Sequence, residues 1–542
     1  MEWIRNKTAY HSVEEAILGM SGQSAEELLS PSEVPAEQVC GIKQAGETIE
    51  ECIRKNMPVV IVGDYDADGI TSTTILTRLL YSMGVKVRPI IPRRFTDGYG
   101  VSDSILEGVE KSLIITVDNG IAAGDVLDKA ATEHGNTVVV LDHHLADGRE
   151  PKHAAVICDP HMDGDSSPYK EYCGAGLAFK LAQYMLRAAD ISAMPDDLLV
   201  LACIGTIADS MPLTGDNRAI VMNGLRRVNS GEAHLPAGIN QLLWTASSGA
   251  PMNEETIAYT VAPLINAPGR MYNAGGTSVL KALLCTDNNN AQTYLGKMVA
   301  INNDRKATVE EWMGKIRAAI DTQEKLSAPL VAFAKKMPEG IVGLVAGKLA
   351  NQYHVPTIVL VETEDGIAKG SGRSYGDFDM KAMLDTLSDL LITYGGHVGA
   401  AGLSLMPDKV SEFRKRARDY CTGIEQAGEY IRYDIVLQPQ DFGAAVQTLK
   451  KYQPFGQGVP KPVCMVRGFQ ALGMLEMGTN KTHIKLSGRN GNVVAFNMAE
   501  AFRSMGSPEV IDAVGSLGEN TFRGETTVQF LADDIRAHIC FF

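Results

Sequence analysis

Short apolar runs alternate with stretches of helical periodicity along the first part of the chain. The runs of strand length are Val59–Val62, Val85–Ile91, Leu113–Val117, Thr137–Leu141 and Ala155–Cys158. The helical stretches are Ser72–Met83, Gly124–His134, Gly174–Asp190 and Asp197–Asp209. Apolar runs of four to seven residues suit buried strands. Their alternation with helices predicts βαβ units and an α/β fold built on a mostly parallel sheet.

The pattern changes twice further along. From Asn217 to Leu326 no strand-length run occurs, and helices are predicted, ending in a long charged one over Asp287–Gln323. A second α/β pattern follows, with a strand at Leu330–Phe333, a helix at Val342–Tyr353 and a strand at Thr357–Val361. From about Tyr433 short strands dominate, at Val463–Arg467, His483–Leu486 and Asn492–Asn497. Glycine and asparagine turns between them predict a small barrel or a capping sheet.

These changes divide the chain into five expected regions. They are an N-terminal helical segment (1–57), a first α/β domain (58–235), a helical region with the long connecting helix (236–326), a second, smaller α/β domain (327–428) and a β-rich domain (429–542). In the first region, Ser12 and Glu15 resemble a capping box, and Ser32 is a second candidate helix cap. We expect this segment to pack on the first α/β domain.

Composition limits the class of protein. The chain has 542 residues, 45% of them hydrophobic and 21% charged, which is typical of a globular protein of roughly three or four domains. No run approaches the ~20 apolar residues of a membrane span, and the N-terminus has no signal-peptide core. Nine scattered cysteines without a CxxC pair predict reduced thiols and a cytoplasmic location. A net charge of −15 argues against nonspecific coating of nucleic acid, but not against a local basic groove.

An acidic cluster follows the first apolar run. Asp64, Asp66 and Asp68 alternate there, and we expect Gly69 to let the chain turn into the next helix. Three carboxylates within five residues repel one another, and bound divalent cations offset that repulsion. An acidic, solvated turn is the alternative.

Polar groups also follow later apolar elements. Asp118 follows Leu113–Val117, the sequence Asp142-His143-His144 follows Thr137–Leu141, and Asp209 ends an apolar helix. The carboxyl ends of parallel strands meet at one edge of a sheet, so these groups are expected to converge. Each of them alone is equally typical of a helix cap or a surface residue.

Carboxylates and imidazoles suit two Mn²⁺ or Mg²⁺ ions, which can activate water and stabilise a displaced phosphoester oxygen. The expected metal ligands are Asp64, Asp66, Asp68, Asp118, His143 and Asp209. Asp118 is the candidate bridge, with Asp66 and Asp68 on either side and His143 completing one shell with Asp209. Asp118, Asp142 and His144 are the expected catalytic residues, and His144 is the candidate donor or general acid at a phosphoryl oxygen or leaving group.

Several motifs carry a resemblance to a known family. DYDADG at 64–69, VDNG at 117–120, DHH at 142–144 and ADSMPL at 208–213 resemble the four motifs of the DHH phosphoesterase superfamily. FTDGYGVS at 95–102, CGAGLAFKLA at 173–182 and APLINAPGRM at 262–271 extend the match. GSGRS at 370–374 and YGGHVGAAGLSL at 394–405 resemble the companion DHHA1 domain. The ordered set resembles the RecJ family of single-strand-specific exonucleases.

The resemblance implies that the DHH and DHHA1 domains face each other across a cleft spanned by the long helix. Arg373 and His397 are expected to bind substrate phosphate, with Ser371 and Gly396 beside them, and Asn266 and Arg270 are expected on a substrate-facing loop. A tight turn and a surface charge are the alternatives, but glycines around these positions allow backbone amides to approach an anion, which a structural turn does not need, so phosphate binding is favoured.

The β-rich tail resembles the RecJ OB-fold domain. Lys481, His483 and Lys485 alternate, so on a strand they would share one face with Phe496 nearby. Such a face either grips a single strand or is ordinarily solvated.

Together these features predict an exonuclease that hydrolyses single-stranded DNA with two divalent cations, Mn²⁺ or Mg²⁺. The resemblance adds 5′→3′ polarity and a role in DNA repair and recombination, with a single-strand-binding protein or a helicase as candidate partners and no membrane partner. Two alternatives remain: a phosphodiesterase acting on oligonucleotides or cyclic dinucleotides, and a non-catalytic replication scaffold that keeps the fold.

Overall fold

The computed structural model of the chain describes residues 2–98, 100–191, 194–320, 328–422, 430–522 and 525–539. The chain forms two compact units. The larger contains Val34–Asp209 and Asn223–Ala427, and the smaller contains Met1–Glu33, Ser210–Met222 and Gly428–Phe542. The smaller unit is therefore built from three stretches that are far apart in the sequence.

The first sheet of the larger unit is parallel and five-stranded, in the order β3-β2-β4-β5-β6. Its strands are β2 (Val59–Val62), β3 (Val87–Ile90), β4 (Leu113–Val117), β5 (Thr137–Leu141) and β6 (Val156–Cys158). From β2 the chain passes to β3 on one side and then returns to β4 on the other. The winding therefore reverses at β2, and ligands bind outside the carboxyl ends of strands at such a switch point.

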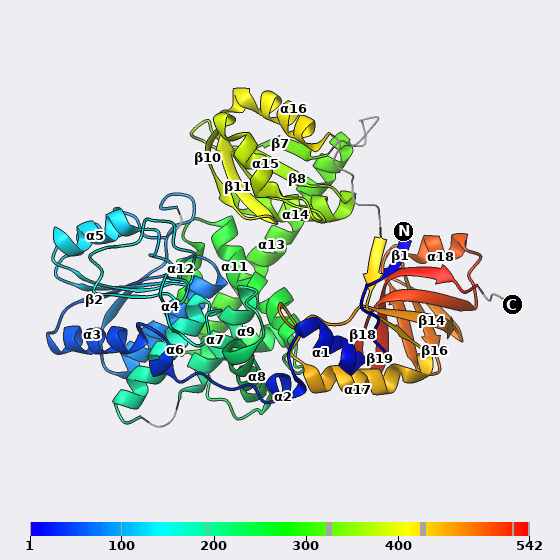
Figure 1. Cartoon of the computed structure of the whole chain (residues 1–542), viewed down its shortest axis with the longest axis horizontal. Coiled ribbons are helices and arrows are strands. Elements are labelled where there is room, and N and C mark those ends of the chain that lie inside the picture. The colour runs from blue at the N-terminus through cyan, green and yellow to red at the C-terminus, as the bar shows by residue number, and fades with distance from the viewer. Residues whose placement is uncertain are drawn as a thin grey trace. The chain divides into compact units, whose positions relative to one another are not determined.

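Helices cover both faces of this sheet, with α5 (Gly124–Thr132) on one side and α3 (Ile42–Arg54) on the other (Figure 1). On the α5 face, Val60 and Val62 of β2 belong to one apolar cluster with Leu127 of α5. Side chains alternate between the faces of a strand, and both faces are covered here. The strands are accordingly continuous apolar runs.

A helical layer adjoins the sheet. Its first helices, α4 (Ala67–Ser82), α6 (Gly174–Ala188) and α7 (Asp196–Ala208), pack against one another. They are followed by α8 (Gly215–Asn229), α9 (Ala237–Ser247), α10 (Glu254–Thr256), the π-helix η2 (Ile257–Val261), α11 (Ala262–Met271), α12 (Gly275–Leu283) and α13 (Asn288–Ile320). The described residues between 217 and 320 contain no strand, as predicted. The long helix is confirmed, and its predicted end at Gln323 lies outside the described residues.

The second sheet of the larger unit has the order β10-β11-β9-β8-β7, with only β7 and β8 parallel. Its strands are β7 (Leu330–Lys335), β8 (Thr357–Glu362), β9 (Ala368–Arg373), β10 (Leu391–Gly396) and β11 (Ala400–Leu405). Its helices are η3 (Glu339–Ile341), α14 (Val342–Tyr353), α15 (Met380–Thr386), η4 (Ser388–Leu390), η5 (Pro407–Lys409) and α16 (Val410–Cys421). Val359 of β8 packs with α13 and α14, and Ile358 packs with α15 and α16, so this sheet is also buried on both faces.

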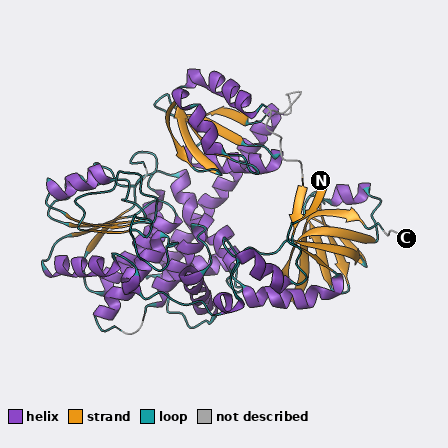
Figure 2. Ribbon diagram, viewed as in Figure 1, coloured by secondary structure: helices purple, strands orange, loops and turns teal. Residues whose placement is uncertain are grey.

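The smaller unit is built on a seven-stranded sheet in the order β13-β14-β18-β19-β17-β16-β15. Figure 2 shows its strands in orange. Its strands are β13 (Ile435–Leu437), β14 (Cys464–Gln470), β15 (Gly473–Met477), β16 (His483–Gly488), β17 (Gly491–Ala495), β18 (Val510–Phe522) and β19 (Glu525–Ala537). Its helices are α1 (Val13–Ser21), α2 (Ala25–Leu29), η6 (Pro439–Asp441), α17 (Phe442–Tyr452) and α18 (Ala499–Ser504). β1 (Glu2–Arg5) and β12 (Tyr430–Tyr433) pair in parallel as a separate ribbon.

The N-terminal segment is mostly helical, as expected, and its helix α3 packs against β6 and α6 of the first α/β domain. The expectation is wrong for the first part of the segment. Residues 2–5 form a strand rather than a helix, and Ile17 and Leu28 pack into the core of the C-terminal sheet instead of the first α/β domain. Ser12 does cap α1, but the complete capping box in this segment belongs to Ser24 and Glu27, and Ser32 is the N-cap of none of the described helices. Local cap signals are short, and the distant apolar partners that fix the position of this segment are invisible in a local pattern.

The prediction for Gly69 is also wrong. Helix α4 begins at Ala67 rather than Ser72, so Gly69 lies inside the first turn of the helix, and Asp66 is its N-cap. A Cβ at Gly69 would lie 2.5 Å from the backbone nitrogen of Asp64. The glycine is needed because the helix starts against the strand end, not because the chain turns there.

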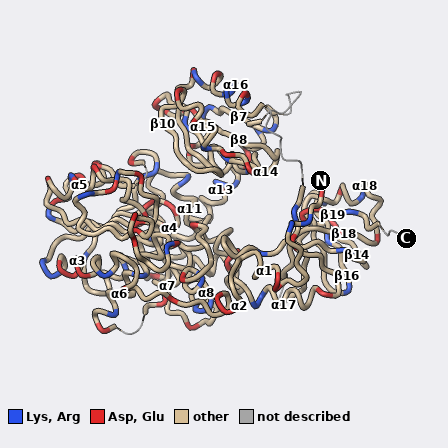
Figure 3. The backbone as a smooth tube through the Cα atoms, in the orientation of Figure 1, with Lys and Arg blue, Asp and Glu red and all other residues tan. Residues whose placement is uncertain are grey.

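No helix in the described parts of the chain is both long enough and apolar enough to cross a bilayer. Acidic and basic positions intersperse along surface helices such as α16 (Figure 3). The 33-residue α13 is long but carries Lys and Arg along its length.

Candidate metal and phosphate site

The first strand and helix place three carboxylates at the edge of the parallel sheet. Asp64 follows β2 and is buried, Asp66 caps α4 by accepting a 3.0 Å hydrogen bond from the Gly69 amide, and Asp68 lies in the first turn. The Asp68 carboxylate accepts hydrogen bonds from the amides of Gly174 (2.7 Å) and Ala175 (2.9 Å), at the start of α6. The positive end of that helix therefore holds Asp68 in place.

The loop after β4 supplies the next carboxylate. Asp118 is buried and has a left-handed backbone with φ of 60°, which aspartate tolerates better than most residues. Its neighbour Asn119 donates side-chain hydrogen bonds to the carbonyls of Val62 (3.3 Å) and Val117 (3.0 Å). Asn119 thus ties together the carboxyl ends of β2 and β4, which border the switch point.

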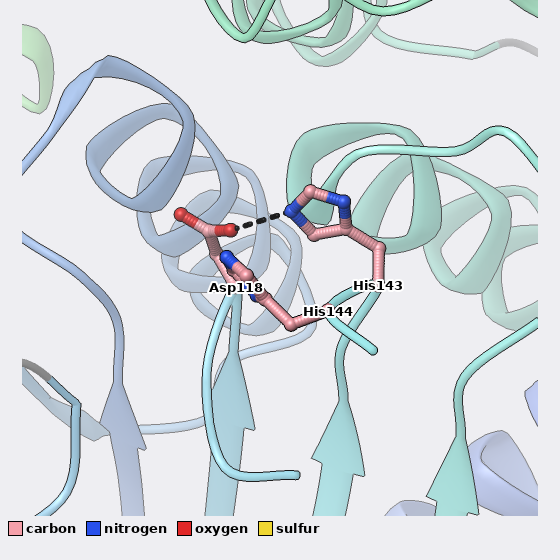
Figure 4. Close-up of side chains that lie close together, drawn as sticks. All are labelled: Asp118, His143 and His144. Carbon is pink, nitrogen blue, oxygen red and sulfur yellow. Dashed lines mark hydrogen bonds and ion pairs between the residues drawn. The ribbon is translucent and has the colours of Figure 1, made fainter. Parts of the chain in front are cut away.

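His143 projects from the loop after β5 toward Asp118 (Figure 4). Its Nε2 lies 3.0 Å from Asp118 Oδ1, 3.8 Å from Asp209 Oδ2 and 3.9 Å from Asp68 Oδ2. Three groups of residues form, and within each group the possible ligand atoms lie within 4.8 Å of one another. The groups are Asp64, Asp66 and Asp118; Asp68, His143 and Asp209; and Asp118, His143 and His144. The structure therefore brings together all six residues expected to hold metal.

The charges of this cluster are unbalanced. Burial, then the neighbouring Asp68, Asp66 and Asp64, raises the pKa of Asp118 well above its ordinary value. Burial also raises the pKa of Asp64, and burial with Asp68 and Asp66 raises the pKa of Asp209 to about 8. Without bound cations, burial and mutual repulsion therefore favour the protonated, neutral form of these carboxyl groups.

Asp142 organises the loop that carries the two histidines. Its Oδ2 accepts the Ile121 amide (2.8 Å), and its Oδ1 accepts the amides of His143 (2.8 Å) and His144 (3.2 Å) and the His144 Nδ1–H (2.8 Å). Burial alone would lower the pKa of His144, but the bond to Asp142 and the charges of Asp142, Asp209 and Asp68 raise it to about 9. Asp142 is thus placed to position His144, not to bind a metal.

The donor set fits divalent cations. Asp64 Oδ1 is buried and has no hydrogen-bond partner among the described residues, which is costly unless an electropositive ligand satisfies it. A Cβ at Gly174 would lie 2.5 Å from the Asp118 Cβ, and one at Gly205 would lie 2.7 Å from Asp68 Oδ1. Glycines therefore leave room for packed carboxylates, and groups that combine carboxylate oxygens with imidazole nitrogens suit Mn²⁺ or Mg²⁺.

A second concave feature of the larger unit is a pocket of about 520 Å³. It takes residues from the second sheet, from the loops that follow β2 and β3, and from α11. Its lining includes Tyr65, Arg94, Arg270, Lys369, Ser371 and Arg373. The Arg373 Nη1 donates to Ser371 Oγ (2.6 Å) and to the Gly372 carbonyl (2.8 Å). Burial, with Arg94 and Arg305 nearby, lowers the pKa of Arg270 to about 10. Several guanidinium groups gathered this closely favour an anionic ligand.

Three expected substrate residues are not among those lining this pocket. Gly396 and His397 lie exposed at the β10–β11 hairpin, where the His397 Nδ1 accepts the Gly399 amide at 3.1 Å. Asn266 lies in α11, and its Oδ1 is buried without a hydrogen-bond partner among the described residues.

Sequence reasoning missed Arg94, Tyr65 and Lys369 as pocket residues. The Arg94 guanidinium lies 4.5 Å from the centre of the Tyr65 ring, and Tyr65 stands between two of the acidic cluster residues. The adjacent arginines at 93 and 94, just before FTDGYGVS, were the available signal. The second sheet of the unit supplies Lys369, which no local pattern marks.

The predicted basic face of the β-rich domain is only partly present. His483 and Lys485 lie on one face of β16, and the His483 ring contacts Phe496 edge to face at 5.1 Å. Lys481 lies outside the strand, in a left-handed turn with φ of 51°. The face therefore has two of the three expected basic positions.

Comparison with known proteins agrees with this architecture. The chain matches the family models "DHH family, N-terminal domain" over residues 58–206, "DHHA1 domain" over 327–423 and "RecJ OB domain" over 433–534. It is 32% identical to the single-stranded-DNA-specific exonuclease RecJ of Bacillus subtilis (strain 168), over 91% of this chain and 63% of that protein. It is 31% identical to the protein of the same name from Dickeya dadantii (strain 3937), over 91% of this chain and 90% of that one.

A solved structure adds the three-dimensional comparison. The crystal structure of RecJ in complex with Mn²⁺ from Thermus thermophilus matches with a TM-score of 0.82 at 27% identity, covering 97% of this chain and 76% of that chain. The fold and the acidic edge thus define a protein that joins a DHH domain to a DHHA1 domain. With the RecJ OB domain and a 31% identical relative covered almost throughout, the chain belongs to the RecJ family.

Proposed function

We propose that this chain is an exonuclease that hydrolyses phosphodiester bonds of single-stranded DNA with two divalent cations, Mn²⁺ or Mg²⁺. The carrying observation is the cluster at the switch point, where three overlapping ligand groups converge on buried carboxylates. The name of the RecJ relatives and the Mn²⁺ complex of the Thermus protein support the same assignment.

Asp64, Asp66 and Asp118 are the proposed ligands of one cation, and Asp68, His143 and Asp209 those of the other, with Asp118 shared between them. Such ions activate water and stabilise charge on a displaced oxygen. His144 is the proposed proton donor to the leaving oxygen. Its Nδ1–H is held by Asp142, so its other ring nitrogen is the one that can act on substrate.

Arg373, Ser371 and Arg270 are the proposed phosphate-binding residues, since they line the pocket of about 520 Å³. Asn266, Gly396 and His397 remain proposed substrate residues on the family resemblance alone. The domain limits expected from the sequence, with a DHH domain at 58–235, a DHHA1 domain at 327–428 and an OB-like domain at 429–542, are likewise part of the proposal.

Family membership supports three further points of this proposal: 5′→3′ polarity, a role in DNA repair and recombination, and a cytoplasmic location. A single-strand-binding protein or a helicase is the proposed kind of partner.

A digestion series tests the function. Single-stranded and double-stranded DNA, labelled at either the 5′ or the 3′ end, are incubated with the protein and Mn²⁺ or Mg²⁺. We expect metal-dependent release of nucleotides from the 5′-labelled single strand first. Release of nucleotides without metal contradicts the proposal. So does the absence of release from every DNA strand when the wild-type protein has bound Mn²⁺.

A further inference from the structure

His161 contacts the backbone of a candidate metal ligand from a loop to which no role has been assigned. Its Nδ1 lies 2.7 Å from the carbonyl oxygen of His143. A carbonyl oxygen only accepts hydrogen bonds, so Nδ1 carries the proton and donates it. The His161 side chain is 23% exposed, which places it at the border of the site rather than on the open surface.

The loop that carries His161 is itself fixed. Asp159 directly follows the end of β6, and its Oδ1 accepts the His161 amide at 2.8 Å. The Asp142 amide donates to the carbonyl of Cys158, the last residue of β6, at 3.0 Å. The loop after the edge strand β6 is thus hydrogen-bonded to the loop that follows β5.

The histidine loop is consequently held from two directions. Asp142 binds the amides of His143 and His144 on one side, and His161 binds the carbonyl of His143 on the other. With both its amide and its carbonyl bonded, His143 has little freedom to rotate its main chain. The Nε2 of His143 is therefore kept near Asp118, Asp68 and Asp209.

We propose that His161 is a positioning residue for one of the two cation positions: by bonding the His143 carbonyl it holds the imidazole where it completes the group with Asp68 and Asp209. The inference rests on the proposed function, since it concerns the same cations. It makes an asymmetric prediction, because Asp64, Asp66 and Asp118 form the other group without His143. Residues that orient metal ligands typically contribute about 10–100-fold to metal affinity.

The decisive variants are a pair of carboxamides of similar size. His161→Asn keeps an N–H close to the position of Nδ1, whereas His161→Gln places its amide one carbon further out. Mn²⁺ binding to the full chain is measured by calorimetry and by the electron paramagnetic resonance of free Mn²⁺, without DNA. We expect His161→Gln to weaken one Mn²⁺ position by about 10–100-fold and leave the other unchanged, and His161→Asn to stay near wild type.

Two further proteins separate the possible failures. His153→Gln, at an exposed histidine that pairs with Asp128, is the matched control and should bind Mn²⁺ as wild type does. Asp118→Ala should weaken both positions. If wild type binds no Mn²⁺, the proposed function itself fails. If wild type binds two ions but His161→Gln matches it, weakens both positions equally or behaves as His161→Asn does, only the role of His161 is overturned.

Discussion

The acidic edge of the parallel sheet and the arginine-lined pocket differ in how burial affects the charge of their side chains. At the edge, buried carboxylates crowd together, and burial raises the pKa values of Asp64, Asp118 and Asp209. In the pocket, burial lowers the pKa values of Arg270 and Arg373, but guanidinium groups remain charged at any ordinary pH. Without cations, burial therefore favours the neutral form of these three carboxyl groups, whereas the guanidinium groups of the pocket keep their charge whether or not an anion is present.

This difference separates the expected consequences of mutation. Changes at the acidic edge should alter metal binding and the chemical step together, because the same atoms serve both. Changes in the pocket should alter the binding of substrate and its salt dependence, while metal affinity stays constant. The following predictions test that separation.

The largest effect is expected at Asp118. Asp118→Ala removes the carboxylate that lies in two ligand groups, so turnover should fall at least about 10³-fold as several kcal/mol of metal assistance are lost. Digestion of labelled single-stranded DNA at saturating Mn²⁺ measures this, and circular dichroism checks the fold. Asp125→Ala, an exposed carboxylate in the first turn of α5, is the control. A folded, metal-saturated Asp118→Ala protein with substantial activity would falsify the assignment of Asp118 as the bridge.

A smaller effect should distinguish the two histidines. His143→Ala removes a proposed ligand and should weaken Mn²⁺ binding at least about tenfold. His144→Ala should leave affinity closer to wild type and mainly slow cleavage, since the His144 Nδ1–H is bonded to Asp142. Calorimetric titration of both variants, with His153→Ala as the control, measures the difference. Equal affinities in the two variants would mean that their roles are assigned wrongly.

Arg373 should show the opposite signature. Arg373→Ala should raise the DNA concentration needed for half-maximal rate roughly tenfold and flatten its salt dependence, with unchanged Mn²⁺ affinity. Arg373→Lys should recover only part, because a point charge cannot reproduce the forked geometry. Steady-state kinetics over a salt series measure both, with the exposed Arg418→Ala of α16 as the control. Unchanged kinetics in both variants would remove the pocket from substrate binding.

The smallest expected effect is on stability without metal. The pKa of Asp209 is about 8 in the folded chain against a usual 3.8, so between these values the folded state holds a proton that the unfolded state has released. The metal-free protein should therefore lose stability as the pH rises from about 4 to about 8. The Asp209→Asn variant lacks this loss.

Relative to Asp209→Asn, the metal-free wild type should melt at a lower temperature at pH 8 than at pH 5, because the folded state holds the extra proton over that range. Thermal scans of both proteins in chelator measure this, with Asp125→Asn as the control. Saturating Mn²⁺ should abolish the difference, because the cation replaces the proton. A melting difference that is independent of pH would show that Asp209 is not held in its protonated form.

Local sequence patterns were enough to predict the strands of the first sheet and the residues that follow them. β2, β4 and β5 have the predicted bounds, because a strand buried on both faces must be apolar throughout. The carboxylates and histidines after those strands could be named because the polarity changes sharply there. The long helix and the β-rich tail were equally visible as changes of period.

Long-range contacts determine the strand order and the packing of distant segments, which no local sequence pattern predicts. The order β3-β2-β4-β5-β6 sets the switch point between the ends of β2 and β4, and a strand does not encode its neighbour. Helices α1 and α2 pack on the core of the C-terminal sheet, and a local pattern cannot show this because their apolar partners lie more than four hundred residues away along the chain. His161 and Arg94 acquired their contacts in the same way, through loops whose own sequences are ordinary. The sequence by itself identified the candidate metal ligands, because carboxylates and histidines follow directly after apolar strands. The tertiary structure decided how those residues are positioned, because the contacts that hold them join segments far apart in the sequence.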